Sequence, residues 1–122
     1  MTLSGEFRKS GKNIGVDWLQ ISVELRKLLD DIKYQIAHAT CVPDEIAVRF
    51  HHRLVAIHPF PNGNGRHARL MADLLAARLG RPRFTWGSRG LVSASDTRRR
   101  YIAALQAADI RDYAPLIAFA RE

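Results

Sequence analysis

The sequence predicts an all-α fold with one small β-hairpin near its N-terminus. Apolar residues recur at helical spacing in five stretches, and residues that start or end helices flank those stretches. A length of 122 residues, with 47% hydrophobic and 25% charged residues, suits one soluble globular unit with a single core. We therefore expect one domain that spans residues 1–122.

The hairpin is predicted at about residues 5–17. Glu6, Phe7 and Arg8 precede a polar turn, and Ile14 lies in the second short strand. An exposed strand edge can bind an extended peptide through main-chain hydrogen bonds. This hairpin could therefore be a flap that docks a target, and a purely structural hairpin is an equal alternative.

Two helices are predicted next, at residues 22–39 and 43–57. Ser22 is the candidate N-cap of the first, and Pro43 suits the first position of the second. Trp18 and Leu19, just before these helices, are expected in the core. The first helix has one apolar stripe, formed by Leu25, Leu28, Leu29, Ile32 and Ile36.

A third helix is predicted at about residues 65–79, with Gly80 and Pro82 as its stop signal. Asp73 should be solvated or in a local ion pair. The residues expected to be buried on this helix are Leu70, Met71, Leu74 and Leu75.

The remaining chain is predicted as a loop followed by two helices. In the loop, residues 81–94, the apolar side chains of Phe84, Trp86 and Leu91 either cover the core or line a ligand pocket. Ser95 or Asp96 should cap a helix that ends near residue 108, and a last helix covers about residues 113–121. Tyr101, Ile102 and Leu105 are expected to be buried.

The stretch between the second and third helices, residues 58–69, has the features of a phosphate site. Asn62, Gly63, Asn64 and Gly65 all tolerate turn conformations, so successive N–H groups can point into one concavity. The following helix directs further unpaired N–H groups and its positive dipole end to the same place. Within this stretch Phe60 should pack inward as a structural anchor.

Charged and titratable side chains complete this site. Arg66 and Arg69 share one face in the first turn of the helix, so both can bind an oxyanion. The side chain of His58 can take a proton near neutral pH, and two nearby guanidinium groups should disfavour its charged form. A base beside a polyphosphate site suggests transfer of a phosphorus-containing group to a hydroxyl.

This stretch resembles the signature of the Fic/Doc family, His-Pro-Phe-x-acidic-Gly-Asn-Gly-Arg-x-x-Arg. In style the chain is similar to the branch called mobile mystery protein B. Asn62 departs from the pattern, because most active members carry Asp or Glu there. The positions that match the signature loop, as we call residues 58–69, are His58, Pro59, Phe60, Gly63, Asn64, Gly65, Arg66 and Arg69.

The resemblance implies a mainly helical Fic-like fold and transfer of AMP, or another nucleoside monophosphate, to a protein hydroxyl. It implies that His58 is the general base and that Arg66 and Arg69 hold the outer phosphates of ATP or another nucleoside triphosphate. The residues implied as the phosphate cradle are Gly63, Asn64 and Gly65. A kinase branch of the family has Ala and Lys at positions 63 and 65, so the glycines favour nucleotidyl transfer.

The acidic position of the family signature normally holds Mg²⁺, and Asn62 supplies only a neutral oxygen there. Affinity for Mg²⁺ should fall as a result. Three outcomes stay open: a working transferase whose metal is held mainly by the nucleotide, a slow or altered one, and a catalytically impaired nucleotide-binding module. A second class of alternative is a nucleic-acid-binding protein on the same scaffold.

The sequence indicates partners and compartment only in broad terms. A formal charge of +7 suits nucleotides, nucleic acid or an acidic protein, although nucleic acid is not favoured over a nucleotide. The family's inhibitory pattern, Ser/Thr-x-x-x-Glu-Gly/Asn, does not occur, so any inhibitor is expected to be a separate antitoxin-like protein. We expect a cytoplasmic protein without a membrane span, and His51 and His58 form no zinc motif.

The chain begins almost at the flap, whereas many relatives have helices before it. Either the domain is minimal or an N-terminal portion lies outside this sequence. Apolar surface would then be exposed, so we expect self-association.

Overall fold

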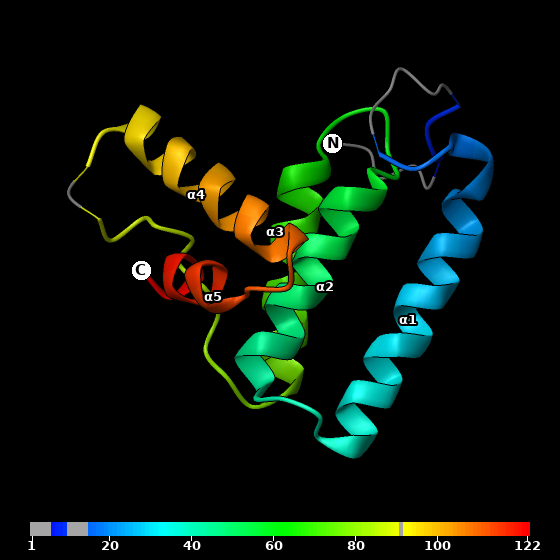
Figure 1. The fold of residues 1–122 in the computed structure, drawn as a ribbon, viewed down its shortest axis with the longest axis horizontal. Coiled ribbons are helices and arrows are strands. Elements are labelled where there is room, and N and C mark those ends of the chain that lie inside the picture. Colours follow the sequence, from blue (N-terminus) through cyan, green and yellow to red (C-terminus); the bar gives the residue numbers. More distant parts are fainter. Residues whose placement is uncertain (1–5, 10–14, 91) are drawn as a thin grey trace.

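The computed structural model describes residues 6–9, 15–90 and 92–122, and their secondary structure is helical (Figure 1). The mainly helical class is thus confirmed. Antiparallel helices α2 and α3 lie at the centre, α1 packs on α2 from one side, and α4 and α5 pack together on the other. The elements are a 3₁₀ turn η1 (Trp18–Gln20), α1 (Ile21–His38), α2 (Pro43–Ile57), α3 (Asn64–Arg78), α4 (Ala94–Asp109) and α5 (Ala114–Arg121).

The predicted bounds of α2 are confirmed at both ends, and two predicted caps are wrong. Helix α1 starts one residue before Ser22, and no side chain caps it. The N-cap of α4 is Ser93, whose Oγ accepts from the Asp96 main-chain N–H at 3.2 Å. A hydroxyl at the N-cap satisfies one of the orphan donors of the first turn, which is why the helix begins there.

The predicted β-hairpin at residues 5–17 is not supported, because no described residue of the chain forms a strand. Residues 5 and 10–14, including Ile14, lie outside the described part of the chain. The flanking main chain bonds to the end of α2 and to the start of the signature loop instead. The N–H of Arg8 donates to Pro59 at 2.8 Å, and that of Val16 donates to Ile57 at 3.4 Å.

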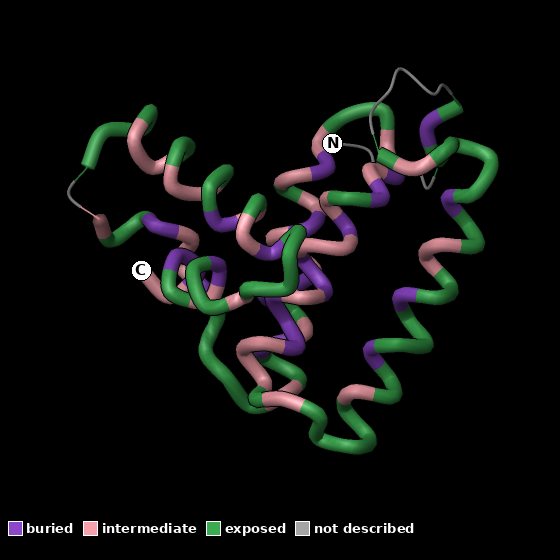
Figure 2. The backbone as a smooth tube through the Cα atoms, in the orientation of Figure 1, coloured by how far each residue is buried: buried purple, intermediate pink, exposed green. Residues whose placement is uncertain are grey.

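The core consists of two hydrophobic clusters, and α2 contributes to both of them (Figure 2). One cluster joins α2 and α3 to α4, α5 and Phe84. The other joins α1, α2 and α3, and includes Leu54 and Ile57 near the signature loop. Because α2 is held on two sides, the end of α2 is a rigid base for that loop.

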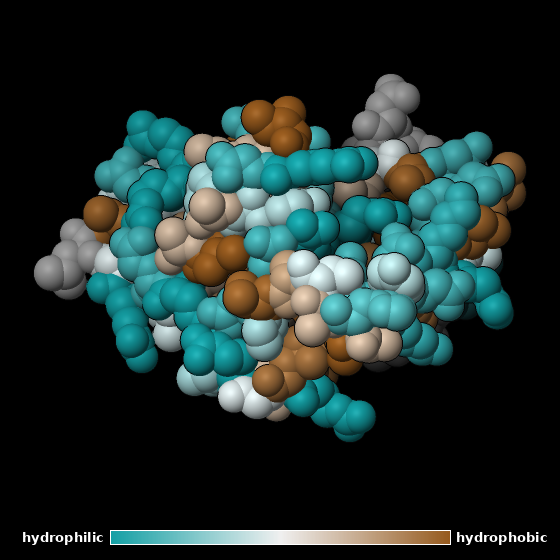
Figure 3. Space-filling view, turned by 60° about the horizontal axis from the view of Figure 1, so that its bottom comes forward, coloured by the Kyte–Doolittle hydropathy of each residue, from teal (hydrophilic) through white to brown (hydrophobic). Residues whose placement is uncertain are grey.

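Several side chains expected in the core are exposed. Among the described elements, α1 makes its close backbone contacts with α2 and η1, so part of its apolar stripe remains outside. The wrongly predicted core residues are Trp18, Leu19, Leu29, Ile36, Leu70, Leu74 and Ile102. On one face the exposed apolar side chains form brown patches among hydrophilic ones (Figure 3). No helix within the described residues is long and apolar enough to span a membrane.

Small residues replace the expected leucines where α3 packs on α2 and where α4 packs on α5 and α2. Helix α3 buries Ala68, Ala72 and Ala76, which are 0% exposed, and α4 buries Ala104 and Ala108. Alanine has no side chain beyond Cβ, so helices that meet through alanines approach closely. Periodicity alone favoured the larger leucines on the neighbouring face.

Candidate functional site

His58 lies where α2 ends, in a left-handed conformation with φ 54° and ψ 61°. Its main-chain N–H still donates to Leu54 at 3.0 Å, so the residue terminates the helix and turns the chain into the loop. A positive φ is uncommon for residues other than glycine, although histidine is among those enriched there. The imidazole is half-buried, and the next residue, Pro59, is fully buried.

Arg8 supports the main chain of His58 from inside the molecule. Predicted as an exposed flap residue, Arg8 is only 5% exposed. Its Nε donates to the His58 carbonyl at 2.6 Å, and its Nη2 donates to the carbonyls of Ile57, at 3.1 Å, and Val16. The guanidinium therefore caps the C-terminal end of α2 and attaches the N-terminal segment to it.

The pKa of His58 is lowered, first by burial and second by the positive charge of Arg8. The sequence had suggested Arg66 and Arg69 as the cause. Because the ordinary pKa of histidine is about 6.5, a lowered pKa leaves the imidazole neutral at pH 7. A neutral imidazole can accept a proton, as a general base must.

Gly15 is a further residue of the site that sequence reasoning missed. Its φ is +73°, and an added Cβ would lie 2.5 Å from both the His58 Cβ and the Ile57 carbonyl oxygen. Only glycine permits this approach of the N-terminal segment to His58. A glycine beside a polar turn was the available signal, but nothing local indicated what it would contact.

Within the signature loop, the side chain of Asn64 clamps the main chain of Phe60. Asn64 Oδ1 accepts from the Phe60 N–H at 2.9 Å, and Nδ2 donates to the Phe60 carbonyl at 2.8 Å. Gly63 is the N-cap of α3 with φ 74°, a conformation that glycine adopts without strain. The side chain of Asn64 thus closes the loop, while Asn62 beside it is exposed.

Phe60 is partly buried between two rings. Its centroid lies 4.7 Å from that of His67, edge to face, and 6.0 Å from that of Phe7. Contacts on both sides restrain the loop, consistent with the structural role expected for this side chain. Of the other proposed flap residues, Glu6 is exposed and Phe7 covers Phe60.

Arg66 and Arg69 lie in the first two turns of α3, and no described carboxylate pairs with either side chain. Arg66 is exposed and Arg69 is partly buried. A Cβ at Gly65 would lie 3.3 Å from Nη1 of Arg69, so the guanidinium lies over the glycine backbone. Gly65 therefore leaves room for Arg69 beside the helix N-terminus, where anions bind.

Tyr101 of α4 connects Arg69 to the buried His51. The Arg69 guanidinium is 5.8 Å from the Tyr101 ring centroid, and the Tyr101 hydroxyl is 2.7 Å from His51 Nε2. His51 is 0% exposed, and burial, as the largest cause, lowers its pKa to about 4. His51 is therefore a neutral structural residue, and Tyr101 is a contact of Arg69 that the sequence did not indicate.

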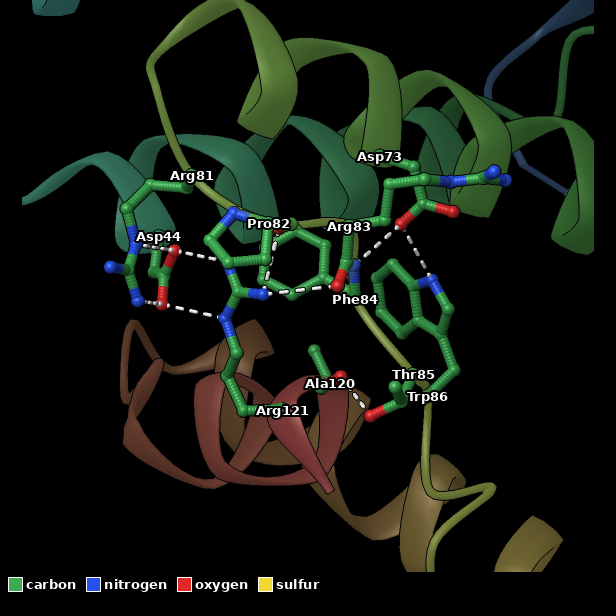
Figure 4. Close-up of polar contacts among 10 residues, drawn as sticks. All are labelled: Asp44, Asp73, Arg81, Pro82, Arg83, Phe84, Thr85, Trp86, Ala120 and Arg121. Atoms are coloured by element: carbon green, nitrogen blue, oxygen red, sulfur yellow. Dashed lines mark hydrogen bonds and ion pairs between the residues drawn. The ribbon is translucent and has the colours of Figure 1, made fainter.

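Asp73 organises the segment after α3, contrary to the prediction that it is solvated. It is 8% exposed and accepts from the Phe84 N–H at 3.2 Å and the Trp86 Nε1–H at 3.1 Å (Figure 4). The Trp86 ring also packs on His51. Phe84 and Trp86 therefore cover the core, and Leu91 lies outside the described residues.

Metal binding would depend on few protein groups. The described residues contain no group of three or more His, Cys, Asp and Glu side chains that could hold an ion. Mg²⁺ commonly takes one or two carboxylates, with phosphates and water completing its shell. Asn62 could contribute one neutral oxygen, so the fit to Mg²⁺ is partial and depends on the nucleotide.

Known relatives match the part of the chain that contains this site. The sequence model of the Fic/DOC family matches residues 2–76, which include the whole signature loop. The protein adenylyltransferase fic-1 of Caenorhabditis briggsae is 33% identical over 78% of this chain and 18% of its own length. Its counterpart from Caenorhabditis elegans is 36% identical over 66% of this chain and 14% of its own length.

Solved structures extend the likeness to the fold. A Fic domain containing signaling protein from Bacteroides thetaiotaomicron superposes with a TM-score of 0.74 at 21% identity, over 94% of this chain and 49% of that one. Fic-1 from Caenorhabditis elegans gives a TM-score of 0.68 at 29% identity, over 96% of this chain and 33% of that one. The chain spans less than a fifth of the two curated relatives' length. By sequence and fold, the chain belongs to the Fic/DOC family.

Proposed function

We propose that the chain transfers AMP, or another nucleoside monophosphate, from a nucleoside triphosphate to a Ser, Thr or Tyr hydroxyl of a protein. One observation carries this proposal: an imidazole kept neutral by burial and Arg8 is followed, through one short loop, by a helix N-terminus bearing Arg66 and Arg69. The name protein adenylyltransferase, which the relatives carry, supports the same reaction type.

In this mechanism the imidazole of His58 takes the hydroxyl proton as the hydroxyl oxygen attacks the α-phosphorus. The new P–O bond forms while the bond between the α-phosphorus and its bridging oxygen breaks, and pyrophosphate leaves. Main-chain N–H groups at the start of α3 and the guanidiniums of Arg66 and Arg69 stabilise the negative charge. Mg²⁺, when bound, would neutralise further phosphate charge.

Asn62 supports a second candidate, a catalytically impaired nucleotide-binding module. The amide is exposed in the loop and carries no charge, so it attracts a divalent cation less than a carboxylate would. In this case the nucleotide still binds but transfer is slow. An Asn62→Asp variant would then gain transfer and require less Mg²⁺.

Labelling with α-³²P-ATP, Mg²⁺ and a cell lysate tests both candidates. Wild type, His58→Ala, Asn62→Asp and the matched control His38→Ala, an exposed histidine on α1, are compared. Label on a protein that disappears with His58→Ala but remains with His38→Ala supports transfer. Label seen only with Asn62→Asp supports the impaired module, and no label with any variant despite bound ATP contradicts the transferase.

Regulation, assembly and nucleic-acid binding stay predictions. The exposed apolar side chains on and before α1, among them Trp18, Leu19 and Leu29, offer a surface for self-association. Sedimentation as a monomer at high concentration would contradict self-association.

An antitoxin-like inhibitor is tested by purifying the chain alone, which should then be active. Salt-sensitive DNA binding without label transfer would favour the nucleic-acid alternative.

A further inference from the structure

A small basic cavity lies beside the segment that follows α3, far from His58. Its volume is about 190 Å³, and we call it the arginine pocket. The whole of α3, 15 residues long, lies between His58 and this segment, which at about 1.5 Å per residue separates the two places by ~20 Å. The lining residues are Arg81, Pro82, Arg83, Thr85, Arg89 and Arg121.

One wall of the arginine pocket is rigid, because Arg121 is held on all sides (Figure 4). Its Nε and Nη2 donate to the Asp44 carboxylate at 2.8 and 2.5 Å. Its Nη1 donates to the carbonyls of Pro82 and Arg83 at 2.8 and 3.2 Å, and its guanidinium lies 4.1 Å from the Phe84 ring centroid. Arg121 therefore fixes the course of this segment.

The arginine pocket has more positive charge than its surroundings neutralise. Arg81 donates to the same carboxylate that holds Arg121, with Nε 3.1 Å from Asp44 Oδ1, so one carboxylate serves two guanidiniums. No described carboxylate pairs with Arg83 or Arg89. The four arginines that line the pocket outnumber the carboxylates that pair with them, so positive charge is in excess there.

The two arginines without a described carboxylate partner, Arg83 and Arg89, can bind a ligand, and the guanidinium group determines which chemical class binds. Arg83 and Arg89 are exposed, while the main-chain N–H of Arg89 is fixed by a 2.9 Å hydrogen bond to the main-chain oxygen of Glu122. Guanidinium groups bind carboxylates and phosphates through paired N–H donors. With Arg83 and Arg89 both to neutralise, a dianionic phosphate is favoured over a monoanionic carboxylate.

We propose that the arginine pocket binds a phosphoryl group, at a site separate from the signature loop. A cavity of about 190 Å³ is smaller than the ~300–1,000 Å³ pockets that enclose a whole small-molecule ligand. The occupant is therefore a free phosphate ion or the terminal phosphate of a larger molecule. Both sources present the same dianionic group to Arg83 and Arg89.

A titration followed by ¹H–¹⁵N NMR tests the proposal. Inorganic phosphate replaces chloride at constant ionic strength, and the amides of Thr85 and Arg89 should shift saturably. The double variant Arg83→Gln/Arg89→Gln should weaken this binding at least tenfold. Arg26→Gln/Arg98→Gln, a control that removes two exposed arginines elsewhere, should change it less than twofold.

The source of the phosphate is distinguished with a short oligonucleotide prepared with and without a 5′-phosphate. Tighter binding of the phosphorylated form assigns the site to a terminal phosphate, and equal binding of the two forms, with inorganic phosphate bound, assigns it to the free ion. Phosphate shifts confined to residues 58–69, or equal phosphate affinity in both double variants, would overturn the proposal. Repeating the titration with His58→Ala separates this site from the transfer reaction, because phosphate binding at Thr85 should persist when transfer is lost.

Discussion

Replacing Arg8 with methionine tests whether the buried guanidinium both stabilises the end of α2 and tunes His58. Methionine fills a similar volume but has neither charge nor donors. The change removes hydrogen bonds to the carbonyls of Ile57, His58 and Val16. Lys9→Met, at an exposed neighbouring position, is the matched control.

The expected loss of stability follows from these contacts. Hydrogen bonds from a charged donor contribute about 1.5–3 kcal/mol each, and relief of the cost of burying Arg8 offsets part of their sum. We expect a net loss of about 3 kcal/mol in the free energy of unfolding. For a chain of this size that corresponds to a fall in Tm of ~12 °C. Lys9→Met should change stability by less than about 0.5 kcal/mol.

The same variant should raise the pKa of His58. The positive charge of Arg8 disfavours the imidazolium, so its removal favours protonation, while burial still opposes it. As the pH is lowered, any activity that needs neutral His58 should then begin to fall at a higher pH than in wild type. Arg8→Lys keeps the charge but not the planar set of donors, so it should lose stability while the pKa of His58 stays low.

Urea denaturation monitored by circular dichroism gives the stability, and NMR titration of the His58 ring protons gives the pKa. The reasoning is refuted if Arg8→Met and Lys9→Met have equal stability, or if the pKa of His58 does not rise in Arg8→Met. If the pKa of His58 rises equally in Arg8→Lys, the cause is the loss of the guanidinium hydrogen bonds and not the loss of positive charge.

Three further predictions concern the loop and the core. Gly15→Ala should lower the free energy of unfolding, measured by urea denaturation, by about 3 kcal/mol, because its Cβ would lie 2.5 Å from the His58 Cβ and the Ile57 carbonyl oxygen. Gly80→Ala has a similar positive φ but open space around it, so it should cost about 1 kcal/mol. Equal costs for the two variants would contradict the contact. Asn64→Asp keeps the side-chain acceptor but loses the Nδ2–H that donates to the Phe60 carbonyl at 2.8 Å. The variant should lose about 2 kcal/mol of stability and bind ATP more weakly. The same change at exposed Asn62 should leave stability intact. The folded-state pKa of His51, about 4, lies below its unfolded value of 6.5, so the unfolded state binds more protons and stability falls as pH decreases from about 6.5 to about 4. Between pH 7.5 and pH 5 the loss from His51 should be about 2 kcal/mol, and an unchanged pH dependence in His51→Gln would contradict this assignment.

Signals carried by neighbouring residues made much of the fold predictable. Pro43 and the two prolines after His58 bound α2 correctly, and Gly80 marks the end of α3, because these residues restrict φ and hydrogen bonding wherever they occur. The position of the signature loop between two helices followed from the same signals. Helical periodicity was a weaker guide, since it favoured Leu70 and Leu74 over the alanines that α3 buries.

Contacts between distant residues could not be read from the chain. Arg8 reaches carbonyls about fifty positions away, and its burial depends on an approach that Gly15 allows. Asp73 looked like a solvated carboxylate until the segment after α3 folded over it and supplied two donors. The contact of Arg69 with Tyr101 likewise depends on the packing of α4 against α5 and α2, which brings the Tyr101 side chain to that of Arg69.

The sequence by itself determined the helices, the signature loop and the family, because each depends on the order of residues along a short stretch. Only the tertiary structure decided which groups surround His58, why its imidazole stays neutral, and where two arginines share one carboxylate beside a pocket that four arginines line. The physical reason is that burial, pKa and charge balance depend on distances across the folded chain, which local pattern does not contain.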